Sequence, residues 1–284
     1  MAMAESSRWA RLFPAACPLI GVVHLQPLPG SPAWQGDLAA VERAALADAE
    51  AYLAGGADGL IVENFGDSPF FANAVPPETV AAMARLATAV VARAGARPVG
   101  INVLRNDALA ALAVAAASGA QFIRVNVLCG AAVTDQGLIQ GQAAELLRRR
   151  RLLGAEALLV LADVLVKHAA PLAPLDLEQA VRDSLERAGA DGLIVSGSGT
   201  GRPTRLEDLE QARALVRQIR PGAPVLVGSG ACLATAEALA ARSDGLIVGS
   251  SLKRSGSVEQ PVDVERVGAM RQLLPQSPQR SVGP

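Results

Sequence analysis

Two acidic residues lie within or at the end of strongly apolar stretches of the sequence, where a charged side chain has little structural purpose. Glu63 ends the stretch Leu60–Glu63, and Asp163 interrupts Leu158–Lys167. Partial burial and a neighbouring cation shift the pKa of a carboxyl group, so such a pair can act as general acid and general base. We therefore predict that Glu63 and Asp163 are catalytic.

Histidine and lysine are rare in this chain, and three of these four residues end or directly follow an apolar stretch. His24 could take up a proton beside the carboxylates, although a histidine at a strand end is about as often structural. Lys167 could pair with Asp163, bind a substrate anion or, if desolvated, form a Schiff base. We count His24 and Lys167 among the candidate catalytic residues.

Asparagine follows the same distribution, since four of the five asparagines stand at or just after the ends of apolar stretches. Strand ends and turns also attract asparagine for structural reasons, which explains part of the pattern. Amides and hydroxyls in such positions can hydrogen-bond a small ligand, as can one arginine inside an apolar stretch. The predicted substrate-binding residues are Asn64, Asn102, Arg124, Asn126 and Ser196.

Glycine-rich segments follow the last two apolar stretches, at residues 228–230 and 249–251. Small residues let backbone N–H groups converge on an anion, and in α/β barrels the last two such loops often bind phosphate. Plain tight turns are the structural alternative. A third glycine-rich segment, residues 197–201, is typical of a mobile loop that covers a ligand. The predicted phosphate-binding residues are Gly228, Ser229, Gly230, Gly249 and Ser250.

Other polar groups are expected at the same end of the sheet. Residues 105–107 and 134–137 add polar side chains there or cap the helices that follow. Glu63 and Asp163 could together hold a divalent cation, but no metal-ligand spacing demands one. No glycine fingerprint for a redox cofactor follows the first apolar stretch, so no cofactor is predicted.

Eight apolar stretches recur along the whole chain, and helical patterns separate them. Each stretch is rich in Val, Ile or Leu and ends at a polar or glycine-rich segment, as strands buried on both faces do. This alternation predicts a parallel sheet, and eight units predict a single (β/α)8 barrel of the TIM type. The strands are expected at Leu19–His24, Leu60–Glu63, Val99–Leu104, Phe122–Leu128, Leu158–Lys167, Leu193–Ser196, Val225–Val227 and Leu246–Gly249, with helices at Leu38–Leu53, Glu78–Ala94, Gln142–Leu153, Leu177–Ala188 and Leu206–Ile219.

An internal repeat supports the barrel. The sequence GADGLIV occurs at Gly56–Val62 and again at Gly189–Val195, with looser copies at Gly119–Val125 and Ser243–Val248. Turn chemistry between helix and strand explains the Gly-Asp-Gly part. The copies enter alternate strands, which in a barrel supply side chains to common interior layers.

The repeat also predicts the surroundings of Arg124. Aligned with the isoleucines of the other copies, Arg124 lies inside the barrel. It then needs Glu63 or Asp163 as its partner, since a lone buried charge is very costly. The opposite orientation of these strands would place Arg124 among the helices instead.

Composition limits the class of protein. The 284 residues are 51% hydrophobic and 19% charged with a net charge of −1, which excludes a disordered chain and argues against a nucleic-acid binder. Three cysteines form neither a disulfide framework nor a zinc site, so we expect a reducing, cytoplasmic compartment. No stretch resembles a membrane span. We expect a loose tail over residues 1–15, the barrel over 16–274 and a second loose tail over 275–284.

Eight motifs in this order together resemble the BtpA family, from about Pro18 to Val267. They are VHLQPLPGSP (23–32), IVENFGDSPF (61–70), PVGINVLRND (98–107), FIRVNVLCGA (122–131), TDQGLIQGQAAE (134–145), ADVLVKHA (162–169), DGLIVSGSGTG (191–201) and LVGSG (226–230). The resemblance implies a TIM-type barrel related to phosphate-binding barrels such as phosphoribosylanthranilate isomerase and tryptophan synthase alpha.

Two functions are expected from these observations. The first is an isomerase or lyase that uses acid–base chemistry on a small phosphorylated substrate, such as a sugar phosphate or a nucleotide-derived phosphate. The second, which the family resemblance implies, is a non-catalytic photosystem I biogenesis factor, peripheral to the thylakoid membrane in a phototrophic host. In either case we expect a homo-oligomer that does not bind nucleic acid.

Overall fold

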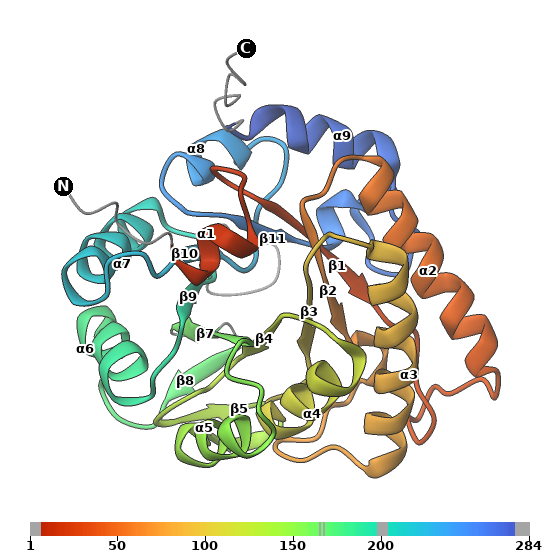
Figure 1. Ribbon diagram of the computed structural model, residues 1–284, viewed down its shortest axis with the longest axis horizontal. Helices are drawn as coiled ribbons and strands as arrows, with labels where there is room; N and C mark the ends of the chain where they lie inside the picture. The colour runs from red at the N-terminus through yellow and green to blue at the C-terminus, as the bar shows by residue number, and fades with distance from the viewer. Residues whose placement is uncertain (1–6, 165, 167, 198–203, 276–284) are drawn as a thin grey trace.

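The computed structural model describes residues 7–275 apart from residues 165, 167 and 198–203, and in these described residues eight parallel strands close into a barrel (Figure 1). Barrel neighbours follow one another along the chain, and the last strand closes the barrel by pairing with the first. The predicted (β/α)8 fold is confirmed. The barrel strands are β1 (Leu19–His24), β2 (Gly59–Glu63), β3 (Val99–Asn102), β4 (Phe122–Val125), β7 (Leu159–Val164), β9 (Gly192–Val195), β10 (Val225–Val227) and β11 (Leu246–Val248).

Helices alternate with the barrel strands and form the outer layer (Figure 1). The helix predicted at Leu177–Ala188 is shorter than expected, because after Arg182 the chain continues as a turn of π-helix over Asp183–Arg187. The helices of the outer layer are α2 (Leu38–Ala54), α3 (Pro77–Ala94), α4 (Ala108–Ser118), α5 (Ala143–Leu152), α6 (Leu177–Arg182), α7 (Leu206–Ile219), α8 (Ala236–Ala240) and α9 (Val264–Leu273).

The strands separate two apolar layers, because successive side chains of a strand point to opposite faces. Side chains on one face pack against the helices, and those on the other face fill the barrel. Ile61, Ile194 and Ile247, from three copies of the repeat, all belong to the interior cluster. The inward orientation predicted for this level of the strands is therefore confirmed.

The Gly-Asp-Gly part of the repeat fastens the strands at their N-terminal ends. In each of four barrel strands (β2, β4, β9 and β11), a residue one or two positions before the strand begins makes two hydrogen bonds to a single residue of the preceding barrel strand. Its backbone N–H donates to the carbonyl oxygen, and its side chain accepts from the N–H group. Asp58 bonds in this way to Leu19, with both distances 2.8 Å. The equivalent pairs are Gln121 with Val99, Asp191 with Val160, and Asp244 with Val225.

We call each of these two-bond contacts a strand clip. Each clip satisfies two backbone groups at the base of the barrel that have no partner within a strand ladder. The three aspartates of the clips also pair with arginines from other elements, whereas the amide of Gln121 carries no charge. These pairs are Asp58 with Arg271, Asp191 with Arg8 and Arg150, and Asp244 with Arg213.

The expected N-terminal tail is too long, because part of it closes the base of the barrel. Helix α1 (Arg8–Leu12) lies across this end in Figure 1, and Trp9 and Phe13 are buried in the interior cluster. The centroid of the Phe13 ring lies 6.0 Å from the centroid of the Phe122 ring. Without these rings the lowest interior layer would face water, which explains why the segment is fixed.

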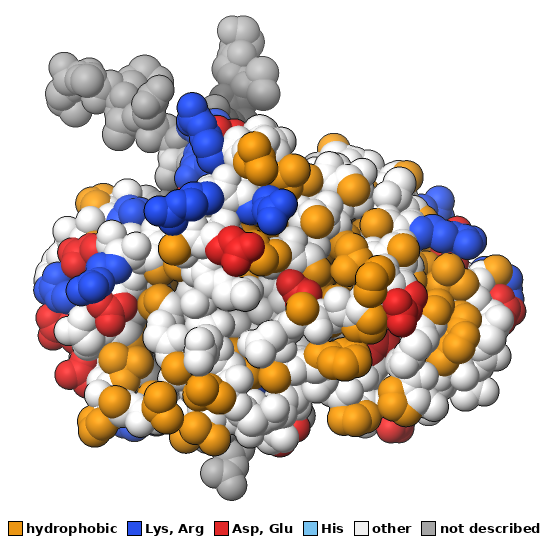
Figure 2. All heavy atoms as spheres, turned by 90° about the horizontal axis from the view of Figure 1, so that it is seen from below, with side chains coloured by type: hydrophobic (Ala, Val, Ile, Leu, Met, Phe, Trp, Pro, Cys, Tyr) orange, Lys and Arg blue, Asp and Glu red, His pale blue; other side chains and the backbone are white. Residues whose placement is uncertain are grey.

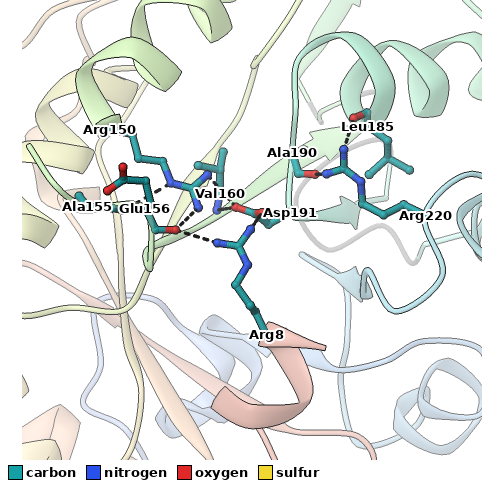
Figure 3. Close-up of polar contacts among 9 residues, drawn as sticks. All are labelled: Arg8, Arg150, Ala155, Glu156, Val160, Leu185, Ala190, Asp191 and Arg220. Atoms are coloured by element: carbon teal, nitrogen blue, oxygen red, sulfur yellow. Dashed lines mark hydrogen bonds and ion pairs between the residues drawn. The ribbon is translucent and has the colours of Figure 1, made fainter. Parts of the chain in front are cut away.

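One strand clip anchors α1. Arg8 Nη1 donates to the Glu156 carbonyl oxygen at 2.7 Å, and Nη2 pairs with the Asp191 carboxylate (Figure 3). Arg150 reaches the same carboxylate from α5, at 3.0 Å. Asp191 therefore joins two barrel strands, the N-terminal helix and an outer helix. At the other end of the chain, α9 ends at Leu273, and the tail predicted over residues 275–284 lies outside the described residues beyond residue 275.

A small antiparallel sheet stands at the C-terminal end of the barrel and was not expected from the sequence. Its strands are β5 (Ala131–Thr134), β6 (Gly137–Gln140) and β8 (Ala169–Pro171), in the order β6-β5-β8. Residues 134–137, for which we considered a helix cap, form a hairpin turn in which Gly137 has a φ of +97°. Strands of three or four residues are too short to show a periodic pattern, which explains the omission.

Among the residues in view, no helix combines the length and the apolar composition that crossing a bilayer requires.

The strand clips predict a graded loss of stability at Asp244. Asp244→Ala removes the acceptor for the Val225 N–H and should lower the free energy of unfolding by about 1–3 kcal/mol. Asp244→Asn should lower it less, because Gln121 performs the same task with a neutral amide. Chemical denaturation of the purified variants measures both changes.

Asp208→Ala, on the exposed face of α7, is the matched control and should change stability by less than about 0.5 kcal/mol. Equal losses for the alanine and asparagine variants at position 244 would contradict the role assigned to the clip.

Candidate functional site

A cavity of about 470 Å³ lies at the C-terminal end of the barrel, where polar side chains from adjacent strands converge. Strands β2 and β3 contribute their last residues, Glu63 and Asn102, while β4 supplies Arg124 and, just after its end, Asn126. The remaining lining comes from loops. The loop residues are Phe65, Phe70, Leu104, Arg105, Asp135, Gln136, His168 and Gly228.

A buried ion pair forms the floor of this cavity. Arg124 Nε donates to Asp163 Oδ2 at 2.8 Å, and Nη2 donates to Oδ1 at 2.9 Å. This bidentate geometry is the strongest that an arginine and a carboxylate can make. Burial alone would lower the pKa of Arg124, but the charge and hydrogen bonds of Asp163 outweigh it and raise the pKa. Of the two partners predicted for Arg124, the structure selects Asp163.

Two further predicted residues are oriented by the same carboxylate. Asn126 Nδ2 donates to Asp163 Oδ2 at 3.0 Å, and Ser196 Oγ donates to Oδ1 at 3.1 Å. Each oxygen of Asp163 thus accepts one bond from Arg124 and one from a neutral donor. Asp163 and Ser196 stand behind Arg124 and are absent from the described lining of the cavity. Asp163 therefore fixes the surrounding side chains in place.

Glu63 faces the cavity from the opposite part of its wall. Its Oε2 accepts a hydrogen bond from Asn102 Nδ2 at 2.5 Å, and its Oε1 lies 3.9 Å from His24 Nε2. His24 packs against the Phe65 ring, with centroids 4.7 Å apart, and stands behind Glu63. One carboxylate oxygen is thus held by an amide while the other faces an imidazole.

Asn64 does not reach the cavity, although it was predicted to bind substrate. Its Oδ1 accepts from the Leu104 N–H at 2.7 Å, and its Nδ2 donates to Asp67 and to the Leu104 carbonyl oxygen. The Asn64 side chain makes the hydrogen bonds that a neighbouring backbone segment would otherwise make, and so joins two loops. This is the structural alternative that we considered for asparagines at strand ends. Lys167, the remaining predicted catalytic residue, lies outside the described residues.

Gly228 and Gly249, two of the predicted phosphate-binding residues, lie where interior side chains leave no room. A Cβ atom on Gly228 would lie 2.9 Å from Arg124 Nη2 and 2.3 Å from Ile194 Cγ2. A Cβ atom on Gly249 would lie 2.6 Å from His24 Cε1. Close packing is a sufficient reason for both glycines, and phosphate binding stays a prediction.

Ser229, Gly230 and Ser250 continue two loops that are neighbours because β10 pairs with β11. Neither loop opens directly into a long helix, since α8 begins several residues later and Ser250 starts a single 3-10 turn. Lys253 follows this turn, but its Nζ bonds to Asp48 at 2.9 Å and both groups are buried. Lys253 therefore supplies no cation to the loops.

Arg105 is a cavity residue to which the sequence had given only a place at the rim. It follows the end of β3 and is buried, and burial lowers the pKa of its guanidinium. Asp135 and Gln136 reach the cavity from the tip of the β5–β6 hairpin. The sequence had placed residues 134–137 at this end of the barrel only as polar or capping residues, because a hairpin turn leaves no periodic signal that would assign its tip to a cavity.

Within the ranges that the structure describes, no three His, Cys, Asp or Glu side chains lie close enough together to hold a metal ion. The two carboxylates considered for a cation differ in their surroundings, because the Asp163 oxygens already accept four hydrogen bonds.

The barrel is similar to solved structures of low sequence identity. A tryptophan synthase chain of Mycobacterium tuberculosis superposes with a TM-score of 0.62 at 17% identity, covering 96% of this chain and all of that one. N-(5'-phosphoribosyl)anthranilate isomerase from Pyrococcus furiosus gives a TM-score of 0.54 at 14% identity, over 90% and 98% of the two chains. These similarities establish a shared fold.

Sequence relatives are much closer. The Photosystem I biogenesis protein BtpA of Synechocystis is 51% identical over 90% of this chain and 88% of its own. An uncharacterized protein of Pyrococcus furiosus is 48% identical over 88% and 91% of the two chains, and one of Caenorhabditis elegans is 33% identical over 91% and 93%. The BtpA family model matches residues 15–275. The chain belongs to the BtpA family.

Proposed function

We propose that this chain is an enzyme that acts on a small phosphorylated substrate, such as a sugar phosphate or a nucleotide-derived phosphate, by isomerase-type or lyase-type chemistry. The cavity at the C-terminal end of the barrel carries the proposal, because active sites of α/β barrels occupy this face. A buried ion pair, two amides and a separately held carboxylate converge there without structural need for so many polar groups.

Glu63 is the proposed general acid and base. The hydrogen bond from Asn102 orients its carboxylate, and one oxygen faces the imidazole of His24. A positioned carboxylate with a second titratable group behind it can move a proton at a carbon next to a carbonyl or hydroxyl group. His24 acts through Glu63 in this scheme and is a positioning residue.

Asp163 has a different proposed role from the one expected from the sequence. All four hydrogen bonds to its oxygens come from the protein, two of them from Arg124. Such a carboxylate has no oxygen turned toward a substrate. We assign Asp163 the task of positioning Arg124 and Asn126, which themselves line the cavity.

The phosphate group is proposed to bind at the adjacent loops after β10 and β11. Gly228 lies in the cavity wall, and both loops are rich in the small residues that let backbone N–H groups approach an anion. Two barrels of the same fold, N-(5'-phosphoribosyl)anthranilate isomerase and 3-hexulose-6-phosphate synthase, are named for phosphorylated compounds. Arg105 adds a cation on the opposite side of the cavity.

A second candidate function is favoured by the name of the Synechocystis relative. It is a non-catalytic photosystem I biogenesis factor, peripheral to the thylakoid membrane. Relatives of similar coverage come from Pyrococcus furiosus and Caenorhabditis elegans, and their names carry no link to a photosystem. A role shared by all these chains must be more general, and we place the enzyme first.

Phosphate binding predicts a stabilising ligand effect. Saturation to about 100 times Kd should stabilise the protein by about 2.7 kcal/mol, which raises Tm by several degrees. Thermal-shift measurements with inorganic phosphate and ribose 5-phosphate test this. Ser250→Asp should abolish the response through charge repulsion, whereas Gln218→Asp, which adds the same charge on the outer face of α7, should preserve it. No response to phosphate or to any sugar phosphate would contradict the proposal.

If Glu63 is the general acid and base, Glu63→Gln should abolish proton transfer and leave the fold intact. Glutamine retains an oxygen for the Asn102 amide, so the fold and ligand-induced shift should persist. Turnover should fall by about 10²–10⁴-fold. Deuterium exchange into the stabilising sugar phosphate, followed by NMR in D₂O, measures the step. If a phototrophic host that carries this variant accumulates photosystem I normally, catalysis by Glu63 is not required for photosystem I accumulation.

The role of Asp163 in the buried ion pair predicts that its replacement strongly lowers the stability of the fold. Asp163→Leu leaves Arg124 charged and buried without a partner and should lower the free energy of unfolding by about 3–5 kcal/mol. The double variant Arg124→Met/Asp163→Leu should recover most of this loss while losing ligand binding. Denaturant unfolding compares the two, and a double variant as unstable as the single one would contradict the role of the pair.

A further inference from the structure

A second cavity, of about 460 Å³, lies beside the first one, under the β5–β6–β8 sheet. Its walls come from the segment that follows β4, from β8 and the segment after it, and from α6. Most of its lining is aliphatic, including Val127, Ala132, Val166, Leu172 and Leu175. The proposed function does not use this cavity.

Apart from the amide of Asn126, the few charged or polar side chains that line this cavity are already engaged. Asp163 accepts its four bonds from the protein, and Asp183 accepts one from Gln179 Nε2 at 2.9 Å. Cys129 lies 3.9 Å from Ser184 Oγ, and burial raises the pKa of its thiol. A charged ligand group would therefore find no counterion here, whereas an uncharged apolar group would exchange water for hydrocarbon contacts.

One residue joins the two cavities. Asn126 lines both, and Asp163, which fixes its amide, lines the second. The Nδ2–Asp163 bond orients the amide, so Oδ1 is the remaining acceptor. Oδ1 is buried, and no described residue donates a hydrogen bond to it. A buried acceptor without a partner is costly, and a ligand N–H or O–H group at the junction would remove that cost.

Apolar side chains are also exposed at the mouth of the second cavity. Leu172 is 63% exposed and Leu175 is 38% exposed, and Val133 and Leu138 of the β5–β6 hairpin are exposed nearby. Figure 2 looks at the molecule from the side of α4 and α5 and shows hydrophobic side chains gathered along its lower edge. An apolar ligand group seated in the cavity would remove the leucines at its mouth from water.

We propose that the second cavity binds an uncharged ring or hydrocarbon group of the substrate whose polar end occupies the first cavity, with a donor group of that substrate bonded to Asn126 Oδ1. The proposal rests on the proposed function and narrows it to a substrate with one polar, phosphorylated part and one apolar part. A simple sugar phosphate would fill only half of the combined site.

Binding of 1-naphthol tests the apolar half, because this probe has an uncharged ring system and one donor. Fluorescence titration of the full chain should show saturable binding. Leu172→Glu should weaken it at least tenfold, while Leu152→Glu, at an even more exposed leucine of α5, should not change it. 1-Methylnaphthalene, which lacks the donor, should bind about fivefold more weakly than 1-naphthol. Absence of binding, or equal binding to both glutamate variants, overturns the proposal.

Inorganic phosphate and 1-naphthyl phosphate distinguish the two proposals. The ester should bind at least tenfold more tightly than either 1-naphthol or phosphate alone, and both Leu172→Glu and Ser250→Asp should weaken it. If phosphate binds but the ring adds nothing, the inference is wrong and the proposed function stands. If 1-naphthol binding depends on Leu172 while neither phosphate probe responds to Ser250→Asp, the apolar assignment stands and the phosphate assignment is wrong.

Discussion

The ion pair between Arg124 and Asp163 constrains the type and the orientation of the residues that surround it. A charge placed inside an apolar barrel must be neutralised, and the bidentate pair does so only if its geometry is kept. Position 228 must then be glycine, because a Cβ atom there would press on the guanidinium. Asn126 and Ser196 must point at the same carboxylate. The floor shared by the two cavities follows from this one interaction.

Much of the fold could be predicted because its signals are local and repeated. Each barrel strand is a short apolar stretch, and eight of them with intervening helices leave few alternatives to a closed barrel. The repeat favoured the inward orientation while leaving the opposite one open, and burial of Arg124 in the inward orientation demanded an acidic partner. Glu63, Asn102 and Asn126 were assigned to one cavity because the C-terminal ends of parallel strands meet at one face.

The remainder depends on contacts that sequence spacing does not encode. Asn64 directly follows β2 and Asn102 is the last residue of β3, yet the first bridges two loops and the second holds Glu63. The small β5–β6–β8 sheet joins segments far apart in the chain, so the second cavity has no sequence signature. Helix α1 is too short to show a period, and only the open base of the barrel explains its position.

The strand clips lie at the end of the barrel opposite both cavities, and this separation has a consequence for how such chains diverge. The base is held by four similar units whose bonds join neighbouring strands and whose side chains line neither cavity. Loops at the other end can be exchanged, lengthened or given new side chains while closure persists. A lineage can thus acquire a new chemistry without a new scaffold, and the clips, rather than the cavity residues, are the features that distant descendants should share.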